Sequence, residues 1–280
     1  MSGSASSDAC LEARHLVKDF RLRSGVKART LHAVKEVSFT LEPGRTVALV
    51  GESGSGKSTI ARMMAKLEAP TSGDVLLDGV PSATRGGALA RYRRDVQMVF
   101  QDPFGSLNPF HTILHHLERP IRIHHPGLSS REVGHRAHEL LERVQLTPSS
   151  RFAERRPHEL SGGQRQRVAI ARALAPGARF IVADEPVSML DVSIRLGVLN
   201  LLADLQRQEH LGVLYITHDL ATARHFSDEI LVMYRGEIVE RGPSDRVILD
   251  PRHEYTRTLL EAAADPDRLG LLRDEVRNGG

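Results

Sequence analysis

The nine residues Gly51-Glu52-Ser53-Gly54-Ser55-Gly56-Lys57-Ser58-Thr59 decide the fold of this chain. They match the pattern G-x-x-x-x-G-K-[ST] of a phosphate-binding loop. The glycines let successive backbone N–H groups turn toward phosphate oxygens, and the following helix presents its positive N-terminus to the same anion. In this pattern Lys57 reaches the β- and γ-phosphates of a nucleotide, while the Ser58 hydroxyl binds Mg²⁺.

The sequence on both sides of the loop fits the setting that such a loop requires. Val47–Val50 predicts a strand before the loop. Apolar residues follow at helical spacing: Ile60, Met63, Met64 and Leu67. Short apolar strands and helical stretches continue to alternate along the chain, up to a hairpin that turns at Arg235-Gly236. This alternation predicts an α/β fold with a largely parallel sheet, the core of a P-loop NTPase.

The segment from about 103 to 172 has a different pattern. It contains helical periodicities, Pro and Gly punctuation and many histidines, but no convincing strand. We expect a helical subdomain there, inserted between strands of a domain that covers residues 11–262. Residues 1–10 are expected to form a flexible N-terminus and residues 263–280 a C-terminal tail.

Composition excludes several classes of protein. The 280 residues carry 38 Lys+Arg and 35 Asp+Glu, a net charge of +3 with the signs interspersed, so a nucleic-acid partner is not indicated. Cys10 is the sole cysteine, which excludes an intrachain disulfide and a cysteine-held iron–sulfur cluster. The first nine residues lack the features of a secretion signal, and no apolar run reaches membrane-spanning length. We therefore expect a soluble or peripheral protein.

A second acidic site follows the apolar run Phe180–Ala183, where Asp184 and Glu185 stand together. Such a run is common at strand ends. Behind a phosphate loop, however, a buried strand delivers its terminal Asp to Mg²⁺, and the next carboxylate can act as general base toward water. We assign these two roles to Asp184 and Glu185.

The pentapeptide Leu160-Ser161-Gly162-Gly163-Gln164 narrows the choice among families of P-loop proteins. Ser161 is a candidate N-cap, and the two glycines expose backbone N–H groups at a helix start, which gives a second anion site. With these residues the chain resembles the ATP-binding-cassette family over roughly residues 11 to 262. The resemblance implies a P-loop core with an antiparallel β subdomain and a helical subdomain. It also implies that ATP and Mg²⁺ are held between the phosphate loop of one subunit and Ser161–Gln164 of another.

The same resemblance implies roles for further residues. Gln101 matches the glutamine that touches Mg²⁺ and water, and His218 matches a histidine that contacts the γ-phosphate. Ser188-Met189-Leu190-Asp191 matches a loop that crosses the dimer interface, although the family more often has Ala at the position of Met189. Phe20 falls near an adenine-stacking aromatic position. Tyr is commoner there, and we expect the stretch from Arg21 to Thr30 to be a long loop.

Two other stretches are similar to the oligopeptide/dipeptide importer branch of the family. They are Gln101–Pro109 (QDPFGSLNP) and Pro251–Arg257 (PRHEYTR), where Glu254 replaces the Pro of the usual HPYT. The branch often carries a cysteine-bearing C-terminal tail with an iron–sulfur cluster. We expect neither here, because Cys10 is the only cysteine of the sequence. The resemblance implies two integral-membrane permease subunits as partners, together with an extracytoplasmic solute-binding protein that acts indirectly. A second cassette ATPase is also implied, more often a paralogue than an identical chain.

These observations define the expected activity: ATP hydrolysis at the cytoplasmic face of the membrane that drives import, with peptides as the cargo. Importers of nickel or other small solutes belong to the same branch and remain an alternative. A soluble cassette ATPase acting on ribosomes or DNA is another, although such members usually have two cassettes or a long coiled-coil insertion. Seven of the 14 histidines lie between His111 and His138. We interpret them as a solvent-facing or permease-facing surface rather than a metal site.

Overall fold

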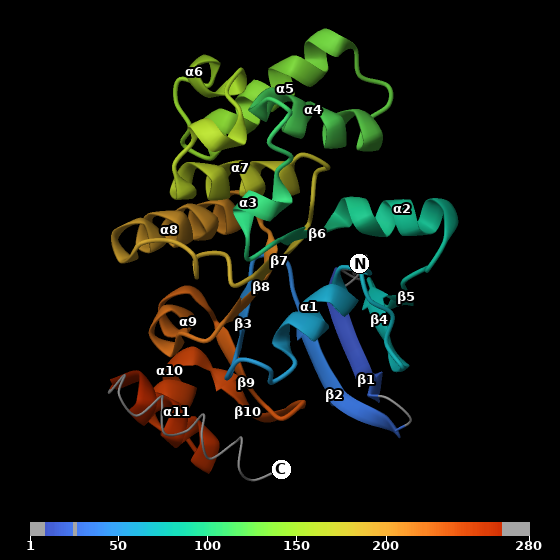
Figure 1. The fold of residues 1–280 in the computed structure, drawn as a ribbon, viewed down its shortest axis with the longest axis vertical. Coiled ribbons are helices and arrows are strands. Elements are labelled where there is room, and N and C mark those ends of the chain that lie inside the picture. The colour runs from blue at the N-terminus through green and yellow to red at the C-terminus, as the bar shows by residue number, and fades with distance from the viewer. Residues whose placement is uncertain (1–8, 25–26, 265–280) are drawn as a thin grey trace, which may run out of the picture.

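The computed structural model describes residues 9–24 and 27–264, which form two β-sheets and surrounding helices (Figure 1). The larger sheet has six strands in the order β10-β9-β3-β8-β7-β6, and the smaller has four in the order β2-β1-β4-β5. The strand bounds are β1 Leu11–Ser24, β2 Lys27–Leu41, β3 Thr46–Val50, β4 Ser72–Leu77, β5 Val80–Pro81, β6 Val96–Val99, β7 Phe180–Asp184, β8 Gly212–Thr217, β9 Glu229–Tyr234 and β10 Glu237–Pro243.

The six-stranded sheet is parallel except at one edge, as predicted. β3 lies between β8 and β9 and is parallel to both, and β7 is parallel to both β8 and β6. The predicted hairpin forms β9 and β10, which pair in antiparallel fashion. Every residue of β3, β7 and β8 is buried, which explains why these strands appear in the sequence as continuous apolar runs. Because β9, β3, β8, β7 and β6 are parallel, their carboxyl ends meet at one edge of the sheet.

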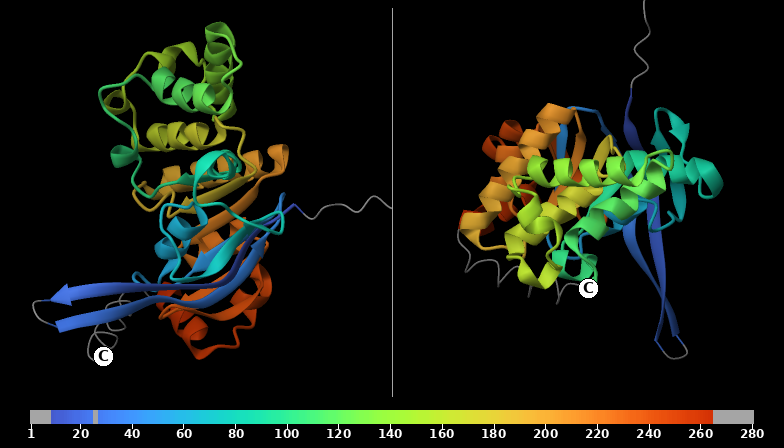
Figure 2. Two further views of the ribbon diagram at one scale, coloured as in Figure 1. Left: turned by 90° about the vertical axis from the view of Figure 1, so that its right-hand side faces the viewer. Right: turned by 90° about the horizontal axis from the view of Figure 1, so that it is seen from above.

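The smaller sheet is antiparallel and contains a long hairpin formed by β1 and β2. The expectation of a long loop from Arg21 to Thr30 is wrong, because Arg21 pairs with Thr30 and the ladder continues to Ser24 and Lys27. Figure 2 shows this ribbon projecting from the body of the molecule. A two-stranded ribbon has no core to face, so its sequence needs no apolar alternation and does not identify it as a strand.

Helices cover the six-stranded sheet and form a separate group beyond it. Their bounds are α1 Lys57–Met64, α2 Gly86–Asp95, α3 Pro103–Ser106, α4 Ile113–His124, α5 Ser130–Arg143, α6 Ser150–Ala153, α7 Gly162–Leu174, α8 Val192–Glu209, α9 Leu220–Phe226, α10 Ser244–Leu249 and α11 Glu254–Ala264, with a 3₁₀ turn at Pro157–Glu159. The described regular elements between β6 and β7 are all helices, and α4, α5 and α6 lie at one end of the molecule (Figure 1). The division of the chain into subdomains stays a prediction.

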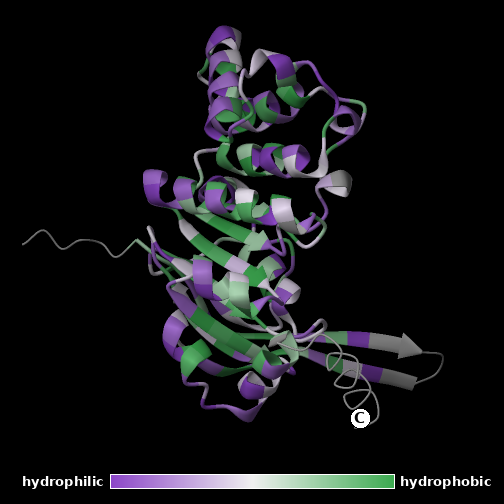
Figure 3. Cartoon of the chain, turned by 90° about the vertical axis from the view of Figure 1, so that its left-hand side faces the viewer, coloured by the Kyte–Doolittle hydropathy of each residue, from purple (hydrophilic) through white to green (hydrophobic). Residues whose placement is uncertain are grey.

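The core lies on both faces of the six-stranded sheet. Within β3, Ala48 and Val50 belong to one buried cluster, while Val47 and Leu49 belong to the other. This alternation is the period of two that a strand imposes on its side chains. Figure 3 shows the resulting concentration of apolar residues along the central strands. None of the described helices has the length and hydropathy of a bilayer span.

Candidate functional site

The phosphate loop joins β3 to α1 and requires glycine at two positions. Gly51 has φ +154°, and a Cβ atom there would lie 2.2 Å from the Met233 carbonyl oxygen. Gly56 has φ +111°, and a Cβ atom there would lie 2.3 Å from the Ala33 carbonyl oxygen. No side chain caps the start of α1. The first N–H groups of this helix are therefore left for an anionic ligand.

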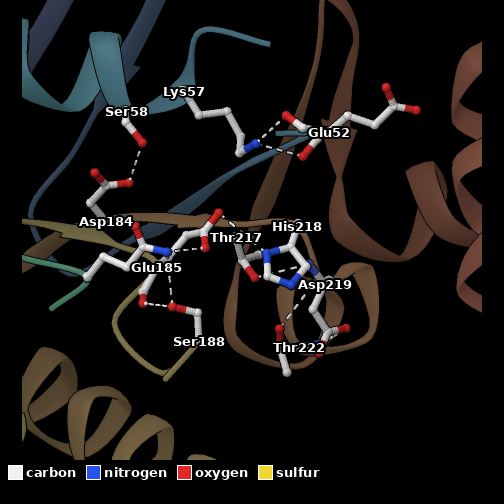
Figure 4. A network of polar contacts seen from close by, with 12 residues as sticks. Glu52, Lys57, Ser58, Asp184, Glu185, Ser188, Thr217, His218, Asp219 and Thr222 are labelled. Atoms are coloured by element: carbon white, nitrogen blue, oxygen red, sulfur yellow. Dashed lines mark hydrogen bonds and ion pairs between the residues drawn. The ribbon is translucent and has the colours of Figure 1, made fainter. Parts of the chain in front are cut away.

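Lys57 lies folded back onto the loop that precedes it (Figure 4). Its Nζ donates hydrogen bonds of 2.7 Å to the carbonyl oxygens of Gly51 and of Glu52, and the residue is only 4% exposed. Burial lowers the pKa of this ammonium group. The Ser55 hydroxyl of the same loop is buried and has no hydrogen-bond partner within the described structure. The loop thus holds a cation and an unsatisfied hydroxyl that suit a polyanion.

Ser58 and Asp184 form the next part of the site. The Ser58 hydroxyl donates to Oδ1 of Asp184 at 3.1 Å, across the gap between α1 and the end of β7. Burial raises the pKa of Asp184. A hydroxyl beside a carboxylate is a hard-oxygen donor set that fits Mg²⁺. Among the described residues no group of three or more His, Cys, Asp or Glu side chains could hold a metal ion, so phosphate oxygens would have to complete the coordination.

Glu185 follows directly and has the strained backbone value φ +44°. Its N–H donates to the Ile216 carbonyl oxygen at 3.0 Å, which ties it to β8. Gln101, beyond the end of β6, donates from Nε2 to Oε2 of Glu185 at 3.0 Å. His218, beyond the end of β8, places Nδ1 3.4 Å from Oε1. Three neighbouring strands thus bring the three predicted side chains together. Figure 4 shows Glu185 and His218 in this arrangement.

The contact between His218 and Glu185 shifts the pKa values of both side chains. The hydrogen bond with Glu185 raises the pKa of His218, and the same bond lowers the pKa of Glu185. Thr217 and Asp219 flank the histidine: Thr217 accepts from the N–H of Asp219, and the Asp219 carboxylate caps α9. Our sequence analysis gave these two residues no role. An Asp before an amphipathic helix is an N-cap signal that could have identified Asp219.

The second predicted anion site lies at the start of α7. The Ser161 hydroxyl accepts from the N–H of Gln164 at 3.3 Å, and the Gln164 side chain accepts from the N–H of Ser161 at 3.0 Å. This capping box confirms Ser161 as an N-cap. A Cβ atom at Gly163 would lie 2.5 Å from Ile194, so α8 leaves no room for a side chain there. Figures 1 and 2 show that α7 and α1 lie apart from each other in the molecule.

Two predicted residues lie outside this cluster. Phe20 is on β1, where it pairs with Leu31 of β2, and the Lys18 ammonium lies 5.0 Å from its ring centroid. It belongs to the four-stranded sheet, whereas the phosphate loop follows a strand of the other sheet. Asp191 is exposed and precedes α8, and its side chain makes no capping hydrogen bond. The adenine and interface roles of these residues stay predictions.

A phosphate loop after the central strand, with carboxylates, an amide and an imidazole at neighbouring strand ends, defines a nucleotide-binding protein of the P-loop class. Residues 34–188 match the family model described as ABC transporter. The chain belongs to this family, as its resemblance in sequence implied.

Curated relatives include the glutathione import ATP-binding protein GsiA. The chain is 47% identical over 276 residues to the protein of Salmonella typhimurium and 48% identical over 264 residues to that of Escherichia coli K12. These matches cover 95% and 92% of this chain, but only 44% and 42% of the relatives. The chain therefore spans less than half the length of these proteins.

Solved structures agree with the fold. A dimeric ATP-binding cassette, MJ0796, in a post-hydrolysis state with ADP and phosphate is 34% identical, with a TM-score of 0.73 over 84% of this chain and 98% of that one. The cassette cbiO1 from Clostridium perfringens, part of the transporter complex cbiONQ, is 24% identical. Its TM-score is 0.74 over 95% of this chain and 99% of that one. Both likenesses confirm the predicted α/β P-loop fold.

Proposed function

We propose that this chain is the ATP-hydrolysing subunit of an importer, and that it acts at the cytoplasmic face of a membrane. The observation that carries the proposal is the position of Glu185, held between Gln101 and His218 at the edge of the sheet where the phosphate loop begins. A carboxylate in that position can take a proton from water that attacks the terminal phosphate.

The side chains of this site have separate roles in hydrolysis. Lys57 and the N–H groups at the start of α1 hold the phosphates. Ser58 and Asp184 would hold Mg²⁺, which when bound neutralises phosphate charge. Gln101 orients the Glu185 carboxylate and the attacking water, and His218 stabilises the γ-phosphate. Little covalent chemistry is required, since the gain comes from positioning and electrostatics.

A second cassette would complete each site. Ser161–Gly163 lie at a helix start whose N–H groups suit an anion, yet the Ser161 hydroxyl contacts Gln164 of its own chain rather than the phosphate loop. We infer that the start of α7 covers the nucleotide of a partner subunit, which is more often a paralogue in this branch. The dimeric state of the related cassette MJ0796 supports this arrangement.

A groove of about 900 Å³ opens beside this site. Ser58 and Asp184 line it next to the proposed Mg²⁺ position, and its part along α3 and α4 would receive the permease. It runs from Ser58 and Gln101 along α3 and α4, and it includes His111, His115 and Arg119. The rings of His111 and His115 stack at 4.1 Å. Arg62 and Arg172 add positive charge, opposed by Asp102 and Asp184. With Arg119, three arginines face two aspartates in the groove, and this excess of positive charge favours a cytoplasmic permease segment that carries carboxylates.

The cargo would be a peptide or a peptide-like solute. Support comes from the QDPFGSLNP stretch and from GsiA, whose name states glutathione import. The alternative of a nickel or other small-solute importer keeps the same ATPase and changes only the cargo. The alternative of a ribosome- or DNA-directed ATPase has no supporting observation in the described fold.

Purification from native membranes would test the proposal. The tagged Glu185→Gln protein would be isolated with ATP present, and the proteins bound to it identified by mass spectrometry. We expect two integral-membrane permeases and a second cassette ATPase. Ribosomal or DNA-repair proteins without a permease would overturn the transport function and leave the ATPase chemistry intact. Transport assays with the recovered permeases would then compare dipeptides, glutathione and Ni²⁺ as cargo.

A further inference from the structure

The peptide unit between Gly51 and Glu52 is held from both sides. Its carbonyl oxygen, on Gly51, accepts from Lys57 Nζ at 2.7 Å. Its N–H, on Glu52, donates to the hydroxyl of Tyr255 at 3.0 Å. Tyr255 is 203 residues away in sequence and lies in the first turn of α11. The orientation of this peptide sets where Lys57 docks, so a residue that fixes the peptide acts on the phosphate loop as a whole.

Tyr255 is itself firmly placed. It is 9% exposed, and its ring stacks on Tyr234, at the end of β9, with the centroids 4.1 Å apart. Burial raises the pKa of its hydroxyl, which therefore stays neutral as an acceptor for the N–H. Farther along α11, Leu259 and Ala262 are buried and hold the helix against the body of the protein.

The chain before α11 is fixed by a buried carboxylate. Glu240 of β10 is 8% exposed, and it accepts hydrogen bonds from the N–H groups of Arg252 at 2.8 Å and His253 at 3.0 Å. Burial acts to raise the pKa of Glu240, but the Thr256 side chain and these two backbone N–H groups outweigh it, so the pKa is lowered. The two backbone bonds fix the N-terminus of α11, the helix that carries Tyr255, because the Glu240 carboxylate binds the two N–H groups just before this helix.

The neighbouring hairpin holds the same loop at a second point. The N–H of Gly236, in the turn between β9 and β10, donates to the Ser55 carbonyl oxygen at 3.0 Å. Gly51 packs so closely on the Met233 carbonyl of β9 that a β-carbon would not fit. The phosphate loop thus rests on β9, on its turn and on Tyr255, all of which come from the C-terminal part of the described chain.

We propose that Tyr255 is a positioning residue for the phosphate loop. Its hydroxyl keeps the Gly51–Glu52 peptide in the orientation that docks Lys57, so it sets the affinity for nucleotide without touching the reacting atoms. This role rests on the proposed ATPase function. It also gives α11, the last helix of the described residues, a direct link to nucleotide occupancy, since the hydroxyl belongs to α11 and the N–H to the loop.

The Tyr255→Phe variant of the full chain tests the proposal, since it removes the hydroxyl and keeps the stacked ring. ADP binding would be measured by calorimetry, and ATP hydrolysis would give KM and kcat. We expect ADP to bind about fivefold more weakly and KM to rise by a similar factor, with kcat within twofold of the wild type. Loss of one hydrogen bond of ordinary strength gives an effect of this size.

Tyr92→Phe is the matched control. The Tyr92 hydroxyl is also buried and donates to a backbone carbonyl, that of Met64 at the far end of α1. This control should bind ADP like the wild type even if its melting temperature falls. Amide hydrogen exchange at Glu52 should accelerate in Tyr255→Phe and not in Tyr92→Phe.

Three outcomes count against the proposal. Unchanged ADP affinity and KM in Tyr255→Phe would overturn it, and so would a lower kcat with KM unchanged. An equal loss of affinity in Tyr92→Phe would show a general effect of destabilisation and would also overturn it. If the wild-type protein bound no ADP and hydrolysed no ATP, the proposed function itself would fail, which is distinguishable from failure of the variant alone.

Discussion

The imidazole of His218 contacts the carboxylate of Glu185, with Nδ1 3.4 Å from Oε1. The other carboxylate oxygen accepts from Gln101, so contacts on both oxygens define the orientation of Glu185. The strained backbone at Glu185, with φ +44°, is held by a hydrogen bond to β8. Strain that neighbouring structure maintains is typical of functional positions.

Replacing Glu185 with Gln should nearly abolish turnover. The amide keeps the size of the side chain but cannot accept the proton, and loss of a general base typically costs a factor of about 10²–10⁴ in rate. Phosphate release would be measured at saturating Mg·ATP. Light scattering would detect an ATP-bound dimer that does not dissociate. Glu237→Gln, an exposed carboxylate on β10, is the control. Normal hydrolysis by Glu185→Gln would remove this residue from the base role.

The His218–Glu185 contact should have a defined pH dependence. The pKa of His218 is raised, so its part of the stabilisation is complete below about pH 6.5 and is lost as pH rises through the folded-state pKa. The pKa of Glu185 is lowered, so its part is present above about pH 4.3 and is lost as pH falls through the folded-state pKa. The contact is therefore strongest between these two values.

Two measurements check this pH dependence of the His218–Glu185 contact. The imidazole signals of His218, followed by NMR, should titrate at a lower pH in Glu185→Gln than in the wild type, because the pKa of His218 is raised by its bond with Glu185. The difference in unfolding free energy between the two proteins should be largest near pH 5 to 6 and should shrink toward pH 8. A His218 pKa that does not respond to the substitution would contradict the contact.

Much of this site follows from local sequence patterns. The phosphate loop, the strand ending in Asp184-Glu185 and the Ser161 cap each lie within a few residues, and their chemistry depends on that spacing. The meeting of Gln101 with Glu185, 84 residues apart, depends on β6 and β7 being neighbours. Strand order is a property of the whole chain, so periodicity could not predict this contact. The resemblance to a family assigned Gln101 to Mg²⁺ and water, and it did not predict the hydrogen bond with Glu185.

Other features had no local signal. The ribbon from Arg21 to Thr30 pairs strand to strand without a core face, and no apolar alternation marks it. Tyr255 reaches Glu52 only because β9 and β10 bring the start of α11 beside the phosphate loop. The PRHEYTR stretch that contains Tyr255 indicated the importer branch, but nothing in that stretch predicts a contact with the phosphate loop. These are tertiary relationships, and only the folded arrangement contains them.

Gly56→Ala should destabilise the nucleotide-free protein strongly. The new Cβ atom would lie 2.3 Å from the Ala33 carbonyl oxygen, and the φ value of +111° is unfavourable for any L side chain. Gly79→Ala is the control, because its φ of +75° is also positive but a Cβ atom there meets open space. In urea unfolding we expect a loss of about 1 kcal/mol for Gly79→Ala and of about 3 kcal/mol or more for Gly56→Ala. Equal losses would show that the close approach to Ala33 has no energetic weight.

Ser161→Ala and Ser129→Ala form a pair that separates stability from assembly. Both serines begin a helix with a capping box: Ser161 with Gln164 at α7, and Ser129 with Glu132 at α5. Loss of either cap should lower the unfolding free energy by about 1 kcal/mol.

Only the start of α7 is proposed to cover a partner's nucleotide. In the Glu185→Gln background, Ser161→Ala should therefore weaken the ATP-dependent dimer, while Ser129→Ala should leave it intact. Dimerisation would be followed by sedimentation with Mg·ATP against Mg·ADP. If both variants dimerised equally well, the Ser161 hydroxyl would be a helix cap alone, and contacts to the nucleotide would have to come from the backbone N–H groups of Gly162 and Gly163.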